Sequence, residues 1–351
     1  LGSDFDIKTF TGNAKISSKN VITGTLNSRL LNARYTVNPK KQTVVINARS
    51  KGYLKVNYGG SSYVVSPDIE NLVVKFNETN VLRSGRLRLK LKDLSVPFIK
   101  TIRTNIKIHN GNYKIIGTAG TKGGTIVNIA GTTTSDMKHS YTLSIPKTVD
   151  IAQELRANGY NFKGLNKAKL PATVTARISG KGSHFSGAYE LFSPYGEYIA
   201  EYEKLRVNGK INDLKNLDMT INTNMDELWF GYQRLKNVKG NLNIKDNVVN
   251  ISNIQNENLT ASGKFDIKTG KMDINAQLKD YMLYNTSSQK INLNVGVLTA
   301  NLSGTVDKLS GTISLPAAPT TINSNYVGDT NAFLNIKNGV IDFQNVTLRE
   351  N

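Results

Sequence analysis

Apolar and polar residues alternate along most of the chain, and Gly, Asn or Asp interrupts the alternation at short intervals. Between Gly85 and Lys92, the leucines Leu87, Leu89 and Leu91 take every second position and Arg or Lys takes the others. Successive side chains of a β-strand point to opposite faces, whereas the 3.6-residue period of a helix cannot separate residues in this way. The pattern therefore predicts β-strands with one apolar face.

The alternating runs occur in pairs that are joined by short polar turns. The clearest turns are Lys245-Asp246-Asn247, Lys268-Thr269-Gly270 and Lys337-Asn338-Gly339. Asn, Asp and Gly tolerate the positive φ angles that tight turns between antiparallel strands require. Because these units recur through the chain, the sequence predicts an all-β, repetitive antiparallel sheet.

One segment near the middle of the chain departs from this alternation. Asp150 is a suitable N-cap and Gly159 a suitable stop for a short helix between them. We place it in an insertion at about 146–172, between Pro146 and Pro171. Repeats of the same pattern lie on both sides, so we expect one elongated β-segment over residues 1–351.

A second segment, 224–235, leaves helix and strand equally open. Met225, Leu228, Tyr232 and Leu235 have helical spacing, but Gly231 interrupts the run.

The charge of the chain is strongly positive, with 45 Lys and Arg against 26 Asp and Glu and a net charge of +19. The cations are spread along the whole chain, and no recognition helix, zinc finger or aromatic RNA-binding motif accompanies them. We therefore expect a solvated outer strand face and no nucleic-acid partner. The chain has no Cys, which excludes disulfides and thiol chemistry.

No apolar stretch approaches the roughly 18–20 residues that cross a bilayer as a helix. The chain begins Leu1-Gly2-Ser3 and shows no signal peptide. We expect it to be a segment of a longer protein, with any membrane anchor outside it.

The sequence offers no convincing catalytic or metal site. His109, His139 and His184 lack metal-ligand spacing. Ser135, Asp136, His139 and Ser140 are close in sequence, but catalytic triads are assembled from separate segments. We expect a non-enzymatic protein without a cofactor.

Carboxylates and tyrosines are concentrated between residues 189 and 203, a composition that is compatible with sugar binding or an enzyme acting on polysaccharides. Because the chain has a surplus of cations, we favour salt bridges for these carboxylates. The residues are Tyr189, Glu190, Tyr195, Glu197, Tyr198, Glu201, Tyr202 and Glu203.

Several repeats share a more specific scheme: an aliphatic residue, a polar residue, a small or aliphatic residue, Gly, and then alternation. They are Leu205–Ile211, Val238–Ile244, Leu259–Ile267, Ala300–Val306 and the closing Ile336–Leu348. The chain thereby resembles the TamB and AsmA-like proteins, relatives of the bridge-like lipid transfer proteins. The resemblance covers most of residues 200–351 and, more faintly, 85–135.

This resemblance implies a sheet curled lengthwise into a taco-like hydrophobic groove that carries phospholipid acyl chains between inner and outer membranes. It further implies a location in the periplasm of a double-membraned bacterium, an anchor in the inner membrane, and contact with an outer-membrane barrel of the Omp85 type.

Every second residue of each strand would then line the groove. The predicted lining residues are Leu87, Leu89, Leu91, Ile106, Ile108, Leu242, Ile244, Val249, Ile251, Phe265, Ile267, Met272, Ile274, Leu293, Val295, Leu334, Ile336, Ile341 and Phe343. The same alternation would also form the closed core of a sandwich or a β-solenoid. A solenoidal surface adhesin or autotransporter passenger, or a factor for outer-membrane protein assembly, therefore stays an alternative.

Overall fold

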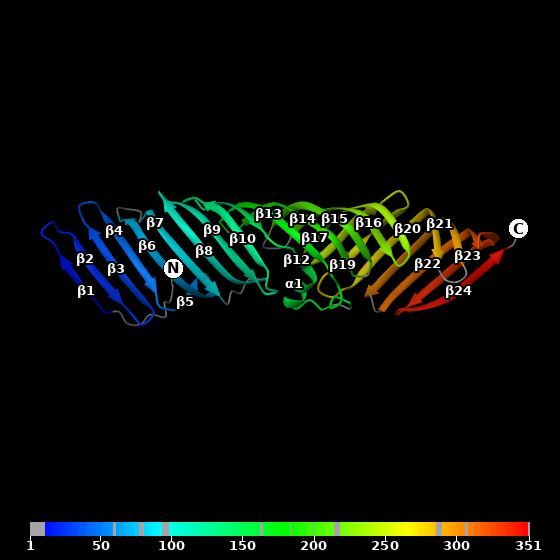
Figure 1. Cartoon of the computed structure of the whole chain (residues 1–351), viewed down its shortest axis with the longest axis horizontal. Coiled ribbons are helices and arrows are strands. Elements are labelled where there is room, and N and C mark those ends of the chain that lie inside the picture. The colour runs from blue at the N-terminus through cyan, green and yellow to red at the C-terminus, as the bar shows by residue number, and fades with distance from the viewer. Residues whose placement is uncertain are drawn as a thin grey trace. The chain divides into compact units, whose positions relative to one another are not determined.

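The structure is a computed structural model that describes residues 11–58, 61–76, 81–92, 98–161, 164–182, 184–198, 200–213, 218–285, 290–305 and 308–349. Within these residues it contains 24 strands and one α-helix, and the strands form one open antiparallel sheet. The prediction of a repetitive all-β sheet is confirmed. The chain divides into two compact units, and within each most consecutive strands lie side by side (Figure 1).

The first unit comprises Leu1–Pro146 and Thr175–Ser183. Its strands are β1 (Thr11–Ile16), β2 (Ile22–Asn27), β3 (Leu31–Asn38), β4 (Thr43–Ser50), β5 (Leu54–Tyr58), β6 (Ser61–Lys75), β7 (Val81–Lys92), β8 (Ile99–His109), β9 (Asn112–Thr121), β10 (Ile126–Thr133), β11 (Lys138–Ser144) and the second part of β13 (Pro171–Lys181). Strand β6 pairs with both β4 and β5, and β11 pairs directly with β13.

The second unit comprises Lys147–Val174 and His184–Asn351. Its elements are β12 (Val149–Asp150), α1 (Ile151–Ala157), the start of β13, β14 (His184–Glu197), β15 (Glu201–Asp213), β16 (Asp218–Phe230), β17 (Gln233–Lys245), β18 (Val248–Gln255), β19 (Leu259–Asp266), β20 (Met272–Asn285), β21 (Ile291–Thr305), β22 (Lys308–Ile322), β23 (Asn325–Lys337) and β24 (Val340–Arg349). From β14 to β24 each strand pairs antiparallel with the next.

The tight turns of the second unit lie where the sequence predicts them. Asp246 and Asn247 have φ values of 52° and 66° between β17 and β18. Asn338 and Gly339, between β23 and β24, have φ values of 53° and 80°. These left-handed conformations match the twist of the strands they join, which is why Asn, Asp and Gly occupy them.

The predicted helix is present as α1, and its N-cap is Asp150. The carboxylate of Asp150 accepts hydrogen bonds from the backbone N–H groups of Ala152 at 3.0 Å and Leu170 at 3.2 Å. The second bond ties the end of the insertion to the helix start. Gly159 follows the helix with a φ of 86°, as expected of a helix stop.

The insertion has a small core of its own. Ala152 of α1 packs with Leu165 and Ala168, and Tyr198 beyond β14 covers this cluster. Lys169 pairs with Glu197 in an isolated antiparallel bridge. The insertion is therefore fixed against the end of β14.

The segment 224–235, which the sequence leaves open, forms the end of β16 and the start of β17. Met225 pairs with Val238 and Leu228 with Leu235. Val238 and Leu235 are buried, whereas the two residues between them are exposed and one of these, Asn237, has a φ of 53°. An irregularity at Asn237, without a shift in register, thus spaces the inward residues three apart, which resembles helical spacing.

Candidate functional site

The alternating apolar residues lie on one face of the sheet, and the strand register places them in continuous rows in the second unit. Directly paired residues of an antiparallel sheet share a face, so the pairing can be followed from strand to strand. One row runs through Ile221, Leu242, Ile251, Gly263, Ile274, Leu302, Gly311, Ile336 and Ile341. The next runs through Ile211, Met219, Ile244, Val249, Phe265, Met272, Gly304 and Leu309. Neither row contains a polar side chain.

The first unit has the same arrangement. One row runs through Gly12, Leu26, Ala33, Ala48, Ile69, Leu87, Ile106, Ile115, Gly131, Tyr141 and Ile178. Another runs through Leu54, Val65, Leu91, Ile102, Ala119 and Val127. We call the side of the sheet that carries these rows the apolar face of each unit. At about 4.8 Å per strand, the longer row extends roughly 50 Å along the sheet.

The apolar face is only partly covered by the chain itself. Of the predicted lining residues, Ile108, Val295 and Ile336 are buried, Ile341 and Phe343 are exposed, and the others are half-buried. Side chains of a dry, close-packed core would be almost fully buried. The described residues therefore leave much of this apolar surface accessible.

A buried cluster surrounds Val295, which is 2% exposed. Val295, Leu315 and Ala318 form a buried cluster, against which Leu293 and Leu283 pack. Of the predicted lining residues, only Ile267 lies outside a strand: it follows β19, and its N–H donates to the carbonyl of Asn247 at 3.0 Å.

On the same side of β14, burial changes the pKa of Tyr189. Burial raises the pKa of Tyr189 to about 12, and its hydroxyl donates to the carbonyl of Thr220 at 3.1 Å. Tyr202 hydrogen bonds with Ser193, whose side chain is almost fully buried, and burial raises the pKa of Tyr202 as well. The surroundings of both phenols thus disfavour charge.

The predicted lining residues are all large and apolar, so the prediction omitted the glycines of the rows. Gly263, Gly304 and Gly311 occupy row positions between aliphatic neighbours, and Gly131 lies between Ile115 and Tyr141. The repeated order of an aliphatic residue, a polar residue and then Gly is the pattern that could have identified them.

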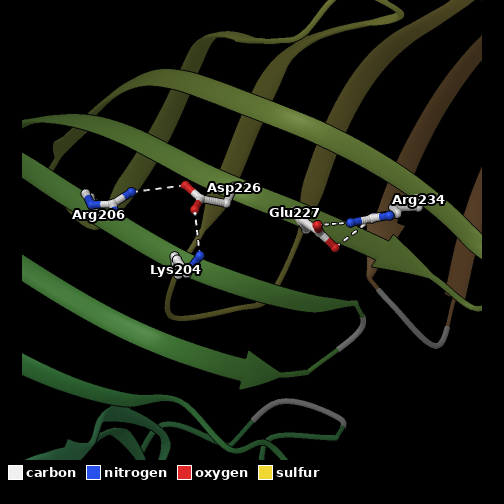
Figure 2. Close-up of polar contacts among 5 residues, drawn as sticks. All are labelled: Lys204, Arg206, Asp226, Glu227 and Arg234. Atoms are coloured by element: carbon white, nitrogen blue, oxygen red, sulfur yellow. Dashed lines mark hydrogen bonds and ion pairs between the residues drawn. The ribbon is translucent and has the colours of Figure 1, made fainter.

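The opposite face carries polar and charged side chains, and β15, β16 and β17 hold an ordered set of them (Figure 2). Asp226 pairs with Arg206 at 3.0 Å and with Lys204 at 3.3 Å. The hydrogen bond from Arg206 is the main cause that lowers the pKa of Asp226. Glu227 binds Arg234, whose guanidinium also lies 5.0 Å from the ring centre of Trp229. The cations that bind Asp226 are exposed, whereas Glu227 is half-buried beside Arg234. We interpret this polar side as the solvated face, where exposed ion pairs contribute little stability.

Side-chain hydrogen bonds close the end of the short β18–β19 hairpin. The amide of Asn256 donates to the carbonyl of Lys236 on β17 at 3.0 Å, and the amide of Asn258 donates to the carbonyl of Asp280 on β20 at 2.9 Å. Beyond this hairpin, the hydroxyl of Tyr281 donates to the carbonyl of Arg234 at 2.6 Å. These bonds connect β17 to β20 where β18 and β19 have ended.

The carboxylates and tyrosines between residues 189 and 203 lie in the β14–β15 hairpin. Glu197 pairs with Glu201 and Tyr195 with Glu203. Tyr195 is exposed, and its pKa is raised by desolvation and by the charges of these carboxylates. The carboxylates are not engaged in the ion pairs found in the described residues, so the salt bridges predicted for them are not observed there.

His139 and Asp136, from the sequence cluster around Ser135, have local structural contacts. His139 hydrogen bonds with Thr133 at 3.0 Å and with the carbonyl of Gly182 at 3.1 Å. Asp136 pairs with Lys138 at 2.9 Å. Within the described ranges, no group of three His, Cys, Asp or Glu side chains could hold a metal ion.

Comparisons with protein-family models and with curated proteins found no match to this chain. Among the described residues, no helix has the length and apolar character needed to cross a membrane.

Proposed function

We propose that this protein is a non-enzymatic lipid-transfer conduit, in which the apolar face guides phospholipid acyl chains between the inner and outer membranes of a bacterial envelope. The observation that carries the proposal is the unbroken passage of apolar rows from strand to strand in each unit. Partial burial of these residues adds support, because a lipid chain could supply the missing cover.

The energy of exposed hydrocarbon explains why the rows must have no polar gap. An acyl chain of about 16 carbons loses roughly 12 kcal/mol of hydrophobic stabilisation when it is fully exposed to water, at about 0.8 kcal/mol per CH₂. A chain that slides along a continuous apolar row keeps most of that stabilisation. A single buried charge in the row would interrupt this continuous apolar contact.

The resemblance to TamB and AsmA-like proteins agrees with this function. On that basis we propose a periplasmic location, attachment to the inner membrane through a segment outside this chain, and an outer-membrane barrel of the Omp85 type as a partner. A solenoidal adhesin is a weaker candidate, because consecutive strands pair antiparallel here, whereas a β-helix stacks parallel strands.

Phospholipid that co-purifies with the protein provides the test. After gentle extraction, phospholipid should be detected by mass spectrometry in the wild-type protein. It should fall at least severalfold in Ile274→Asp and Ile106→Asp, because each introduces a carboxylate into an apolar row in a different unit.

Neighbouring residues provide matched controls. Asn275→Asp and Asn105→Asp add the same charge to the same two strands on the opposite, exposed face, and should retain the lipid. Circular dichroism would confirm that all four variants fold. The conduit hypothesis would be wrong if the wild-type protein carried no phospholipid, or if the folded row variants carried as much as their controls.

A further inference from the structure

Strand β24 is the outermost strand of the second unit, and all ten of its residues are exposed (Figure 1). Among the strand pairings of the described residues, β24 pairs with β23 and with no other strand. Its second edge therefore presents backbone N–H and C=O groups that no described strand takes up. An edge of this kind can accept a strand from another chain.

The apolar face of β24 carries four large side chains that the chain leaves largely uncovered. Ile341, Phe343, Val346 and Leu348 are 51–67% exposed. The first three of them pair with apolar residues of β23. Proteins commonly protect such edges with Lys or Pro, and β24 contains neither. The edge is therefore suited to a partner that also covers apolar side chains.

The order of apolar and polar residues in β24 reads the same in both directions. Residues 341–348 are apolar, polar, apolar, polar, polar, apolar, polar and apolar. Two copies of this strand can thus pair antiparallel across a two-fold axis between the two central residues. Ile341 then faces Leu348 of the second copy, and Phe343 faces its Val346. Directly opposed residues share a face, so the apolar side chains of both copies lie on the same side of the joined sheet.

The bulge in β24 lies at the centre of this pairing. Phe343 and Asn345 pair with consecutive residues of β23, so Gln344 is the residue that the bulge inserts. The two-fold axis passes between Gln344 and Asn345, and the bulges of the two copies therefore coincide. A bulge elsewhere in the strand would put one half of the pairing out of register.

The charges of β24 also suit a second copy of the same strand. Asp342 and Arg349 are the only charged residues of β24, so this edge is neutral although the net charge of the chain is +19. In the two-fold pairing, Asp342 faces Thr347 of the second copy, and Arg349 of that copy lies two residues further along the same face. Long side chains reach such diagonal neighbours, so two symmetric Asp–Arg pairs can form and no like charges face each other.

We propose that β24 is a dimerisation strand, which pairs antiparallel with β24 of a second copy of this chain across an axis between Gln344 and Asn345. The interface is isologous: the same edge serves both copies, so the assembly closes at two chains. The dimer uses the edge of the sheet, whereas the conduit function uses its apolar face. The proposal therefore goes beyond the conduit function and does not depend on it.

Sedimentation equilibrium over a range of protein concentrations tests the dimer in the wild-type protein and in two variants. Phe343→Lys places a cation opposite Val346 of the second copy, twice in each dimer by symmetry, and should weaken dimerisation about tenfold or more. Ile16→Lys adds the same charge at a position of β1 that is 73% exposed, and should leave the dimer unchanged. Circular dichroism would confirm that both variants fold.

Single cysteines test the register directly, because the chain has no Cys of its own. Asp342→Cys and Thr347→Cys are prepared separately and then mixed under oxidising conditions. The proposed pairing brings these two positions face to face only between different copies, so a disulfide-linked dimer should form in the mixture and not in either variant alone. A mixture of Lys15→Cys and Thr347→Cys is the control for pairing between β24 and β1.

A wild-type protein that stays monomeric at every concentration would overturn the proposal, and so would equal weakening by the two lysine variants. Larger assemblies that Ile16→Lys abolishes, or cross-linking in the Lys15→Cys mixture in place of the Asp342→Cys mixture, would assign the edge to β1 of another copy and would also overturn it. None of these measurements reads bound phospholipid, so the dimer and the conduit can fail separately.

Discussion

At the scale of single residues, Asp136 shows how a turn fixes the protonation of an exposed carboxylate. Asp136 accepts a hydrogen bond from the hydroxyl of Thr134 and pairs with Lys138 between β10 and β11. Mainly through the bond from Thr134, these contacts lower its pKa from 3.8 to about 2. A lowered pKa means that folding favours the ionised form. Its stabilising contribution is therefore complete above the unfolded-state value and is lost as the pH falls from 3.8 through about 2.

We expect Thr134→Val to raise the pKa of Asp136 from about 2 toward 3.8, because the variant removes the main hydrogen-bond donor. The measurement is an NMR titration of the carboxyl carbon of Asp136. Thr142→Val changes an exposed threonine of β11 and should leave the titration unaltered. An unshifted midpoint in Thr134→Val would rule out this hydrogen bond as the main cause.

At the scale of secondary-structure elements, glycine determines how closely neighbouring strands can approach. Gly311 of β22 has a φ of 149°, and a Cβ at this position would lie 1.9 Å from the carbonyl oxygen of Asn301. Gly263 of β19 is similar, with a φ of 152° and 2.0 Å to the carbonyl oxygen of Asp273. Any other residue would be strained there and would push the paired strand away.

Gly311→Ala should lower the free energy of unfolding by about 1–3 kcal/mol because of this strain and close approach. Urea denaturation followed by circular dichroism measures the change. Gly296→Ala on the adjacent strand β21 is the matched control, since nothing lies within 4 Å of its Cβ position and its φ is not in the left-handed region. It should be neutral or slightly stabilising. Equal destabilisation by both variants would contradict the account.

At the scale of the whole molecule, we expect the stability of each strand to depend mainly on the strands next to it. The main contacts of each strand are with the strands paired to it. Proteins built in this way behave as chains of nearest-neighbour interactions, and their cooperativity decreases with length. Val295 lies in a buried cluster, whereas every residue of β1 is exposed.

Val295→Ala should therefore lower the free energy of unfolding by about 2 kcal/mol, because it opens a cavity in the cluster of Val295, Leu315 and Ala318. The destabilisation should be confined to the strands around this cluster. Hydrogen exchange followed by mass spectrometry should show lost amide protection in β20–β23 and unchanged protection in the first unit. Val346→Ala, at a position that is 54% exposed, should have little effect. Loss of protection throughout the chain would show that the protein unfolds as one cooperative body.

The sequence by itself determined the strands, their apolar face and most of the turns, because these depend on local properties. Period-two alternation fixes the face of each side chain, and the φ preferences of Asn, Asp and Gly locate turns such as Asn338-Gly339. Asp150 and Gly159 located the helix in the same way. The membership of Leu87 and Ile106 in the apolar face of the first unit, and of Ile274 in that of the second, followed from the pattern.

Only the tertiary structure decided how strands are registered and how far the face is covered. The spacing of Met225 and Leu228 is ambiguous until their pairing with Val238 and Leu235 places them on adjacent strands. The pairing of Lys107 with Lys114 depends on the register of β8 and β9. The exposure of Phe343 and the burial of Val295 depend on neighbouring strands. Local pattern sets the direction in which a side chain points, but cross-strand pairing and packing set what it meets.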